Sequence, residues 1–232
     1  KEAAAAEASL ALAAKDVDEK SRLAALDALG GIASPDGPGL DALRAALAGT
    51  EEGDSLQAAS SLGKLGPRAR AAASSIETAF LEGTPRVRAA AAEALVRVLD
   101  DPGKTVPLLV AALKDKETDV RRAAASSLGQ VGPAAEEAAP ALITLLEDFL
   151  CRRAAFEALR GIRPRSVEVL LKALDHRERF VSGYAAERLG ELGADAAEAI
   201  PRLRALSKGG ERRLQRTATE ALAKIEAVVR EF

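Results

Sequence analysis

Apolar residues recur along this chain at a helical spacing, in a pattern that itself repeats. A leucine marks the repeat seven times, and successive leucines are 33, 33, 33, 31, 30 and 33 residues apart. Alanine stands four residues before every one of them, and an apolar residue stands three residues after. These offsets lie on one face of a helix that turns about 100° per residue. The pattern therefore predicts a half-buried first helix in each repeat, marked by Leu29, Leu62, Leu95, Leu128, Leu159, Leu189 and Leu222.

A break follows each first helix, and a second apolar stripe follows the break. Gly132-Pro133 is one such break, and proline is favoured in the first turn of a helix because the N–H it lacks has no partner there. The second stripe runs, for example, through Val106, Leu109 and Leu113. Each repeat is therefore predicted to be helix–turn–helix. Three prolines share an early column of the second helices and are expected to start or bend them: Pro107, Pro140 and Pro201.

Neither helix of a repeat can bury its stripe alone, whereas stacked repeats share one continuous core. The sequence thus predicts an all-α fold, a right-handed α–α superhelix of about six to seven helical hairpins. A helix around residues 8–14 is expected to be the second helix of an incomplete first repeat. We expect a single repeat domain over 1–232, divided approximately into 1–15 (partial), 16–49, 50–82, 83–115, 116–148, 149–176, 177–209 and 210–232 (partial).

The segment Asp119–Leu145 carries a recognisable motif in full. It reads Asp-Val-Arg-x-x-Ala-Ala-x-x-Leu-Gly-x-x-Gly-Pro and then Ala-x-Pro-x-Leu-x-x-Leu. This pattern resembles the HEAT-repeat family, and the short period resembles its phycobilisome-lyase-type subclass, over nearly the whole chain. The resemblance implies a solenoid that mostly serves as a protein-binding scaffold, while a few members are bilin lyases or other enzymes. It also implies that second helices line the concave face. It implies a structural arginine ladder to acidic residues between units, here Arg22, Arg88, Arg121 and Arg152.

Composition argues against several kinds of chemistry. The 33 Lys and Arg nearly balance the 35 Asp and Glu, whereas a dedicated nucleic-acid binder usually has a basic excess. The single histidine, His176, cannot build the multi-histidine di-iron site of HEAT-like hydroxylases, and we expect a solvated turn residue. Tryptophan, which HEAT-like DNA glycosylases use, is absent. Cys151 falls in a core column, which favours a buried inert thiol over a nucleophile or bilin attachment point.

No nucleophile–base–acid set, phosphate-binding glycine loop or metal-ligand spacing is present in the sequence. We therefore expect a non-enzymatic scaffold for a protein or peptide partner, with no catalytic residue, metal or cofactor. A bilin lyase-like or bilin-handling protein is the alternative.

The second helices offer one candidate binding surface. One column has an apolar middle formed by Val110, Ile143 and Leu171, with charged residues on either side, which suits a peptide or helix from a partner. The alternative is that these three residues only widen the core stripe. The polar candidates of this surface are Arg44, Glu77, Thr144, Lys172 and Arg204.

The fifth and sixth repeats offer a second candidate. The period shortens there to 31 and then 30 residues, and four of the six aromatic residues of the chain fall within residues 149–184. Phe149 and Phe180 stand with Arg152 and Arg153, and aromatics with arginine are typical of binding hot spots. Two alternatives stay open. Larger side chains at 156 and 184 could fill space in a tighter stack, or the arginines could contact nucleic acid, although interleaved glutamates dilute their field.

The ends of the chain bear on location and completeness. The sequence begins at Lys1 and contains no methionine, so we expect a processed or truncated end, and the chain could be part of a larger protein or complex. Cytoplasmic location is the default expectation, with periplasmic or secreted location left open. No apolar run reaches the roughly 18 residues that a membrane-spanning helix needs.

Overall fold

The computed structural model describes residues 2–209 and 211–229, and within them every regular element is a helix. The first helices of the repeats form a row that we call the A helices: α2 (Glu19–Ile32), α4 (Glu52–Leu65), α6 (Pro85–Leu99), α8 (Thr118–Val131), α10 (Arg152–Ile162), α12 (Arg179–Leu192) and α14 (Arg212–Val229). The second helices form the B helices: α1 (Glu2–Ala13), α3 (Pro38–Leu47), α5 (Ala73–Glu82), α7 (Pro102–Ala112), α9 (Ala139–Leu145), α11 (Val167–Leu174) and α13 (Ile200–Lys208). The predicted all-α solenoid of helical hairpins is confirmed.

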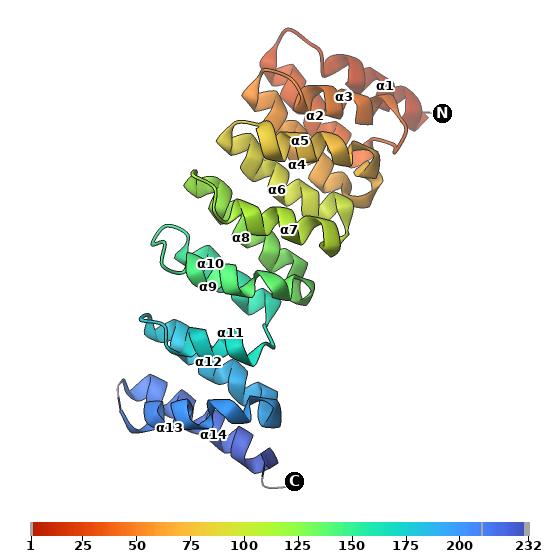
Figure 1. The fold of residues 1–232 in the computed structure, drawn as a ribbon. Coiled ribbons are helices and arrows are strands. Elements are labelled where there is room, and N and C mark those ends of the chain that lie inside the picture. Colours follow the sequence, from red (N-terminus) through yellow and green to blue (C-terminus); the bar gives the residue numbers. More distant parts are fainter. Residues whose placement is uncertain (1, 210, 230–232) are drawn as a thin grey trace.

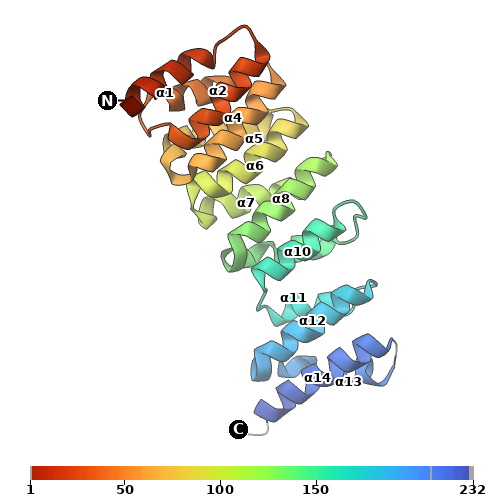
Figure 2. The same ribbon diagram turned by 180° about the vertical axis from the view of Figure 1, so that it is seen from behind.

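The two rows lie back to back along the whole stack. The B helices face the viewer in Figure 1 and the A helices in Figure 2, with the two chain ends at opposite ends of the molecule. Most successive A helices pack closely on each other, and each B helix packs mainly on the A helix of the following repeat. Helix α1 packs on α2 and α3 in the same manner, as expected for the second helix of an incomplete repeat.

Small residues explain the close approach within the A row. A Cβ added at Gly129 in α8 would lie 2.9 Å from the Cα of Ala158 in α10, and one added at Gly190 in α12 would lie 2.8 Å from the Cα of Ala221 in α14. Real Cβ atoms do not come so near a backbone atom, so glycine is what lets these helices touch. The glycine that follows the repeat leucine is therefore a packing residue.

The predicted breaks contain an element that the sequence does not reveal. Gly66, Gly132 and Gly193 adopt left-handed φ values of 58°, 71° and 60°, which end the preceding A helix at a residue without a Cβ. A short 3₁₀ helix then precedes the α-helix in these repeats: η1 (Gly66–Ala72), η2 (Gly132–Ala138) and η3 (Gly193–Ala199).

The proline column starts the helix in two of three cases. Pro140 and Pro201 stand in the first turn of α9 and α13, where no intrahelical N–H bond is lost. Pro107 instead lies inside α7, five residues after the first residue of that helix, Pro102.

The core runs through the stack as one cluster of buried residues, from Ala11 to Ile225. The alanine column and the repeat leucines are buried in every repeat. The column three residues after the leucine is less uniform, because Ile32 is exposed while Val131 and Leu192 are half-buried. Within the described residues, no helix is long and apolar enough to cross a membrane. Lys1 lies outside those residues.

Candidate functional site

The close packing of the A row is interrupted once, between α10 and α12. Their backbones barely approach each other, and both views show α11 and α12 set apart from α9 and α10. The repeat register gives the reason. In the seam between α8 and α10, Gly129 contacts Ala158. In the seam between α10 and α12, the corresponding positions are occupied by Arg160 and Arg188. Two long side chains cannot occupy the space of a glycine and an alanine, so the helices stand apart.

Aromatic side chains fill the widened seam. Phe156 of α10 packs edge-on against Phe180 and Tyr184 of α12, with ring centroids 4.8 and 5.5 Å away. In the preceding seam, the positions that correspond to Phe156 and Tyr184 are alanines, Ala125 and Ala154. The alternative that these aromatics fill space between the helices is thus correct. The expectation that the helices pack more tightly here is wrong. The backbones are farther apart here, and the rings occupy the gap.

Polar bonds from α12 complete this seam. The Tyr184 hydroxyl donates to the Leu159 carbonyl oxygen at 2.6 Å, which fixes the ring against the last turn of α10. The Arg188 side chain is buried and donates to the Arg163 carbonyl oxygen at 3.1 Å, and it pairs with Glu191. The Leu159 carbonyl also accepts from the Arg163 backbone N–H at 2.9 Å, so Tyr184 adds a second bond to it. Arg188 provides a donor for the carbonyl of Arg163, the residue that caps the end of α10.

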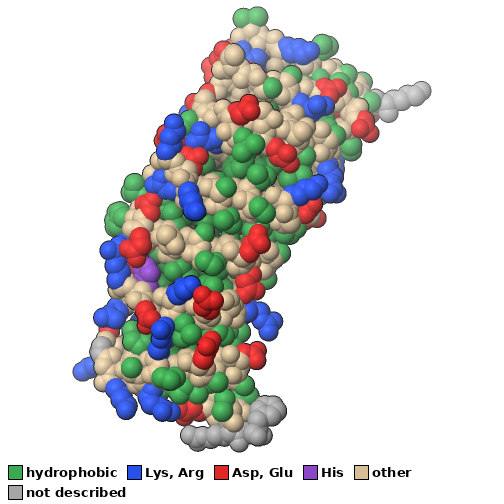
Figure 3. Space-filling view, in the orientation of Figure 1, with side chains coloured by type: hydrophobic (Ala, Val, Ile, Leu, Met, Phe, Trp, Pro, Cys, Tyr) green, Lys and Arg blue, Asp and Glu red, His purple; other side chains and the backbone are tan. Residues whose placement is uncertain are grey.

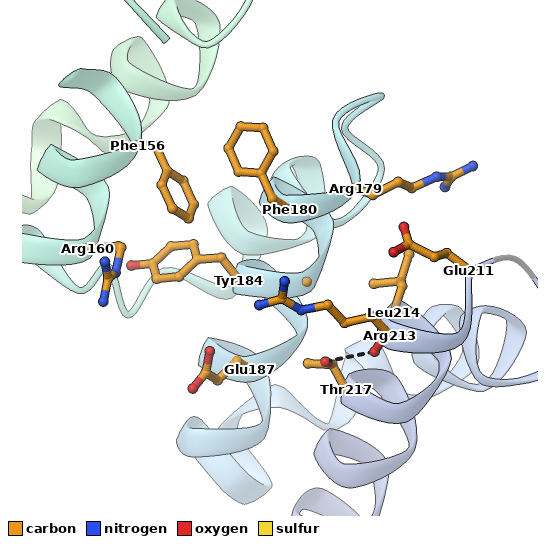
Figure 4. Close-up of a pocket in the computed structure, with 11 residues that line it drawn as sticks. Phe156, Arg160, Arg179, Phe180, Tyr184, Glu187, Glu211, Arg213, Leu214 and Thr217 are labelled. Carbon is orange, nitrogen blue, oxygen red and sulfur yellow. Dashed lines mark hydrogen bonds between the residues drawn. The ribbon is translucent and has the colours of Figure 1, made fainter. Parts of the chain in front are cut away.

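A groove of about 490 Å³ opens beside the aromatic residues, where α10, α12 and α14 meet. Figure 4 shows the rings on one side of it and α14 on the other, with Arg213 reaching from α14 toward α12. Gly183 contributes no side chain, and a Cβ added there would meet nothing within 4 Å. The other lining residues comprise an apolar set, a charged set and one hydroxyl: Phe156, Phe180, Tyr184 and Leu214; Arg160, Arg179, Arg213, Glu187 and Glu211; and Thr217.

Burial sets the chemistry of the tyrosine in this groove. Burial raises the pKa of Tyr184 to about 12, partly countered by Arg188, so the hydroxyl stays protonated at neutral pH. Since that hydroxyl already donates to the Leu159 carbonyl oxygen, a ligand in the groove contacts the tyrosine ring and not its O–H donor. The aromatic wall is therefore a neutral surface.

The arginines of the groove differ in how they are paired. Arg160 lies 3.4 Å from Glu157 on its own helix. Within residues 2–209 and 211–229, Arg179 and Arg213 form no ion pair. The surrounding segment 149–217 carries 15 Lys and Arg against 9 Asp and Glu, although the whole chain has a net charge of −2. The groove is thus a locally basic region of a slightly acidic protein.

The four residues expected at the fifth and sixth repeats are only partly brought together. Phe180 lines the groove and is 43% exposed, while Phe149 is 79% exposed in the turn before α10. Arg152 lies over the Phe149 ring at 5.7 Å and bonds to the Leu146 carbonyl oxygen at 2.8 Å. Arg153 is exposed. Of the four residues, only Phe180 lines the groove, and the other three lie at or next to the exposed turn before α10.

The B-helix surface is nearly continuous with the core. Val110, Ile143 and Leu171 are half-buried and pack against the core cluster, which favours the wider-stripe alternative. Figure 3 shows apolar side chains reaching the surface along the middle of this face, with charges to either side.

The polar candidates of this face mostly bond locally. Lys172 pairs with Glu168 at 2.8 Å, Thr144 donates to the Pro140 carbonyl oxygen, and Arg204 pairs with Glu226 at 2.7 Å. Arg44 lies 3.5 Å from Asp41, and Glu77 is half-buried. Four of these five side chains are thus held by bonds to neighbouring residues of the chain.

The arginine ladder exists as the resemblance implies. Each arginine reaches an acidic residue of the next repeat or of the turn before it, in the pairs Arg22–Asp54 (2.7 Å), Arg88–Asp115 (2.7 Å), Arg121–Asp148 (2.6 Å) and Arg152–Glu178 (3.0 Å). The same side chains bond to turn carbonyls, as Arg121 does to Asp115 and Lys116 at 2.8 and 3.0 Å. Their role is to hold consecutive turns together.

The single histidine differs from expectation. The His176 side chain is only 6% exposed, so the expected solvated turn residue is wrong. Its Nδ1 accepts from the Glu178 backbone N–H at 3.1 Å, and its Nε2 lies 3.1 Å from the Glu147 carboxylate. Nδ1 thus faces the backbone of its own turn, and Nε2 faces Glu147 in the turn between α9 and α10, so the imidazole lies between two consecutive turns.

The single cysteine behaves as expected. Cys151 is fully buried at the start of α10, and burial, followed by the neighbouring Asp148, raises the pKa of its thiol. A thiol with a raised pKa has little thiolate at neutral pH, which is the reactive form.

The sequence pattern did not predict that α14 contributes to the groove. Arg213, Leu214 and Thr217 of α14 line it, and so does Glu211 just before that helix, although α14 belongs to the seventh repeat and the candidates came from the fifth and sixth. A signal was available: the small-residue columns carry Arg160 and Arg188 at one seam, which marks where neighbouring A helices must separate.

Comparisons with known proteins agree with this fold. Residues 78–160 match the family of HEAT repeats. Similar solved structures include an engineered protein (22% identity, TM-score 0.61, 95% of this chain and 68% of that chain) and YibA of Escherichia coli (20%, 0.60, 97% and 81%). Another is a chain of the complex of CpcE and CpcF of phycocyanin lyase from Nostoc sp. PCC7120 (24%, 0.55, 94% and 94%). No significant match is found among curated protein sequences. The HEAT-like repeat architecture is thereby confirmed.

Proposed function

We propose that this HEAT-like solenoid is a non-enzymatic scaffold that holds a segment of another protein in the groove between α10, α12 and α14. The observation that supports this most is the interruption of the A row. At the corresponding positions the other seams carry smaller side chains, such as Gly129 against Ala158 and Val96 against Ser127. This seam instead exposes an aromatic surface beside Arg179 and Arg213, which form no ion pair within the described residues. Aromatic and arginine side chains together are the usual anchors of protein interfaces.

The remaining chemistry of the chain favours binding over catalysis. The two side chains best suited to act as base or nucleophile, His176 and Cys151, are buried at separate structural positions. Within the described part of the chain, no three His, Cys, Asp or Glu residues gather as metal ligands.

Site-directed photo-crosslinking tests the proposal. A photoreactive phenylalanine analogue replaces Gly183, where space is open, and the matched control replaces Gly31 of α2, where a Cβ also meets nothing within 4 Å. The variants are expressed in cells of the source organism and irradiated.

We expect position 183 to crosslink to one defined protein, and the crosslinked residues of that protein to lie within one short segment. We expect no crosslink to the same protein from position 31. Crosslinks that are the same at both positions, or none at 183, would contradict the groove as a docking site.

A bilin-handling role makes a different prediction. It requires a change of the bilin absorption spectrum on mixing with this chain. Cys151 does not offer an attachment point, since it is fully buried with a raised pKa. Titration of phycocyanobilin with the protein tests this alternative directly, and an unchanged visible spectrum removes it.

A further inference from the structure

We infer that the groove selects an acidic segment that carries an aromatic or large aliphatic anchor residue. This inference rests on the proposed function and specifies the partner chemistry. The geometry combines an apolar wall with arginines that have no carboxylate to pair with inside the protein.

The apolar wall provides the anchor position. Phe156, Phe180 and Tyr184 belong to one edge-to-face cluster, so their rings are held in place before any ligand arrives. Phe180 remains 43% exposed, which leaves apolar surface for one large side chain. Burying an apolar side chain against fixed rings stabilises a complex without the cost of ordering them.

The arginines provide the selection for charge. Arg179 stands at the first turn of α12, and Arg213 at the first turn of α14. Arg160 already has Glu157 nearby at 3.4 Å, so Arg179 and Arg213 are the two free cations of the groove among the described residues. A guanidinium binds a carboxylate through two parallel hydrogen bonds, which a lysine or a neutral donor cannot reproduce.

The acidic lining residues restrict where the charges of the ligand can lie. Glu187 and Glu211 line the same groove, so a uniformly negative ligand meets repulsion at two places. A phosphate at every step, as in a nucleic acid, fits this mixed lining less well than carboxylates spaced around an anchor. A protein segment with separated Asp or Glu residues satisfies both the cations and the acids.

The wider charge distribution agrees with this choice. Residues 149–217 carry 15 basic and 9 acidic residues, whereas the rest of the chain carries 18 and 26. An acidic segment is therefore repelled by most of the molecule and attracted to the part that holds the groove, so the charge distribution helps to direct the ligand.

Selection from a randomised 16-residue peptide display library tests the inference. The wild-type chain is the bait, and the variant Gly183→Glu, which puts bulk and negative charge into the groove, is used for counter-selection. Gly31→Glu is the matched control, since its added side chain also has free space but lies on α2. Circular dichroism melts of both variants show whether either has lost its fold.

We expect the enriched peptides to contain one or two aromatic or large aliphatic residues and an excess of Asp and Glu. They should bind the wild type and Gly31→Glu equally and bind Gly183→Glu at least tenfold more weakly. Arg179→Gln and Arg213→Gln should each weaken binding roughly tenfold, as loss of a charge-assisted bond requires. Tyr184, the single tyrosine, reports binding by its own fluorescence if the peptides lack Tyr and Trp.

The outcomes separate the inference from the function on which it rests. Enriched peptides that depend on the groove but are basic or uncharged would overturn the acidic selection and leave the scaffold proposal standing. No groove-dependent peptide at all would count against both. A single-stranded oligonucleotide that binds the wild type more tightly than the peptides, and loses binding in Gly183→Glu, would assign the groove to nucleic acid and overturn the inference.

Discussion

Tyr184 is the single tyrosine of a chain that contains no tryptophan, so near-ultraviolet signals report on the groove almost alone. Its ring packs against Phe156, its hydroxyl is bonded to the last turn of α10, and burial raises its pKa to about 12. At the scale of one residue, it links the two sides of the widened seam. Its ionisation is therefore coupled to the integrity of that seam.

This coupling predicts a specific pH dependence. The pKa is raised in the folded state, so the stabilisation is fully present below the unfolded pKa of roughly 10 and is lost as pH rises through about 12. Absorbance at 295 nm should show phenolate formation near pH 12 in the native chain and near pH 10 in urea. Titration near pH 10 in the native protein would mean that the ring is not buried as described.

A second residue-scale prediction concerns the ladder. Arg121 bonds to Asp148, to Thr118 and to two turn carbonyls, whereas its neighbour Arg122 only pairs with Asp119 on the surface at 3.5 Å. We expect Arg121→Ala to lower the free energy of unfolding by about 2 kcal/mol and Arg122→Ala by less than about 0.5 kcal/mol. Urea unfolding measures both, and a loss for Arg121→Ala as small as that expected for Arg122→Ala would contradict a stabilising role of the ladder.

At the scale of helices, the glycines of the A row divide into two kinds. Gly129 and Gly190 face the backbone of the next A helix, where a Cβ would come within 2.9 and 2.8 Å of a Cα. Gly31 and Gly183 face open space on equally helical backbone. The same residue type thus serves close packing at two positions and only lowers helix stability at the other two.

Alanine substitution should therefore change stability in opposite directions. Gly31→Ala and Gly183→Ala should raise the free energy of unfolding by about 0.5–1 kcal/mol, since alanine is the better helix former. Gly129→Ala and Gly190→Ala should lower it by about 1–3 kcal/mol, since the helices must move apart. Thermal melts of the four variants give the comparison, and the same sign for all four would disprove the packing role.

At the scale of the whole molecule, the seam between α10 and α12 divides a stack that is otherwise evenly packed. The backbones of α11–α14 approach the preceding repeats mainly through α9 and α11, and side chains provide the remaining contact. In a linear repeat array, stability follows from each interface between neighbours. The weakest interface sets where the molecule separates into units.

We expect α11–α14 to exchange backbone hydrogens as one unit before α4–α8 when urea is raised in the native range. Phe156→Ala should widen this difference and cost about 2 kcal/mol, because it removes a half-buried ring from the seam. The exposed Leu81 serves as control, with Leu81→Ala expected to change little. Hydrogen exchange read by mass spectrometry distinguishes this from uniform unfolding, in which all helices would exchange together.

Much of the architecture could be predicted from the sequence, because it depends on local periodicity. The alanine and leucine columns identify the buried faces of the A helices, and Gly132-Pro133 marks a turn without any knowledge of the neighbours. The buried Cys151 follows from the same register, and the shared column of the arginines, together with the resemblance to HEAT repeats, implied the ladder. Each of these features needs only the spacing of residues within one or two repeats.

Only the tertiary structure decided how far the solenoid opens and what lines the opening. Arg160 and Arg188 belong to two different helices, so their effect on the seam depends on how neighbouring repeats align. The same holds for α14, whose Arg213 joins a groove formed by residues more than 25 positions earlier, and for His176, which a turn encloses. Periodicity determines which face of a helix is buried, while contact across repeats determines how far apart the helices stand, and that distance creates the candidate site.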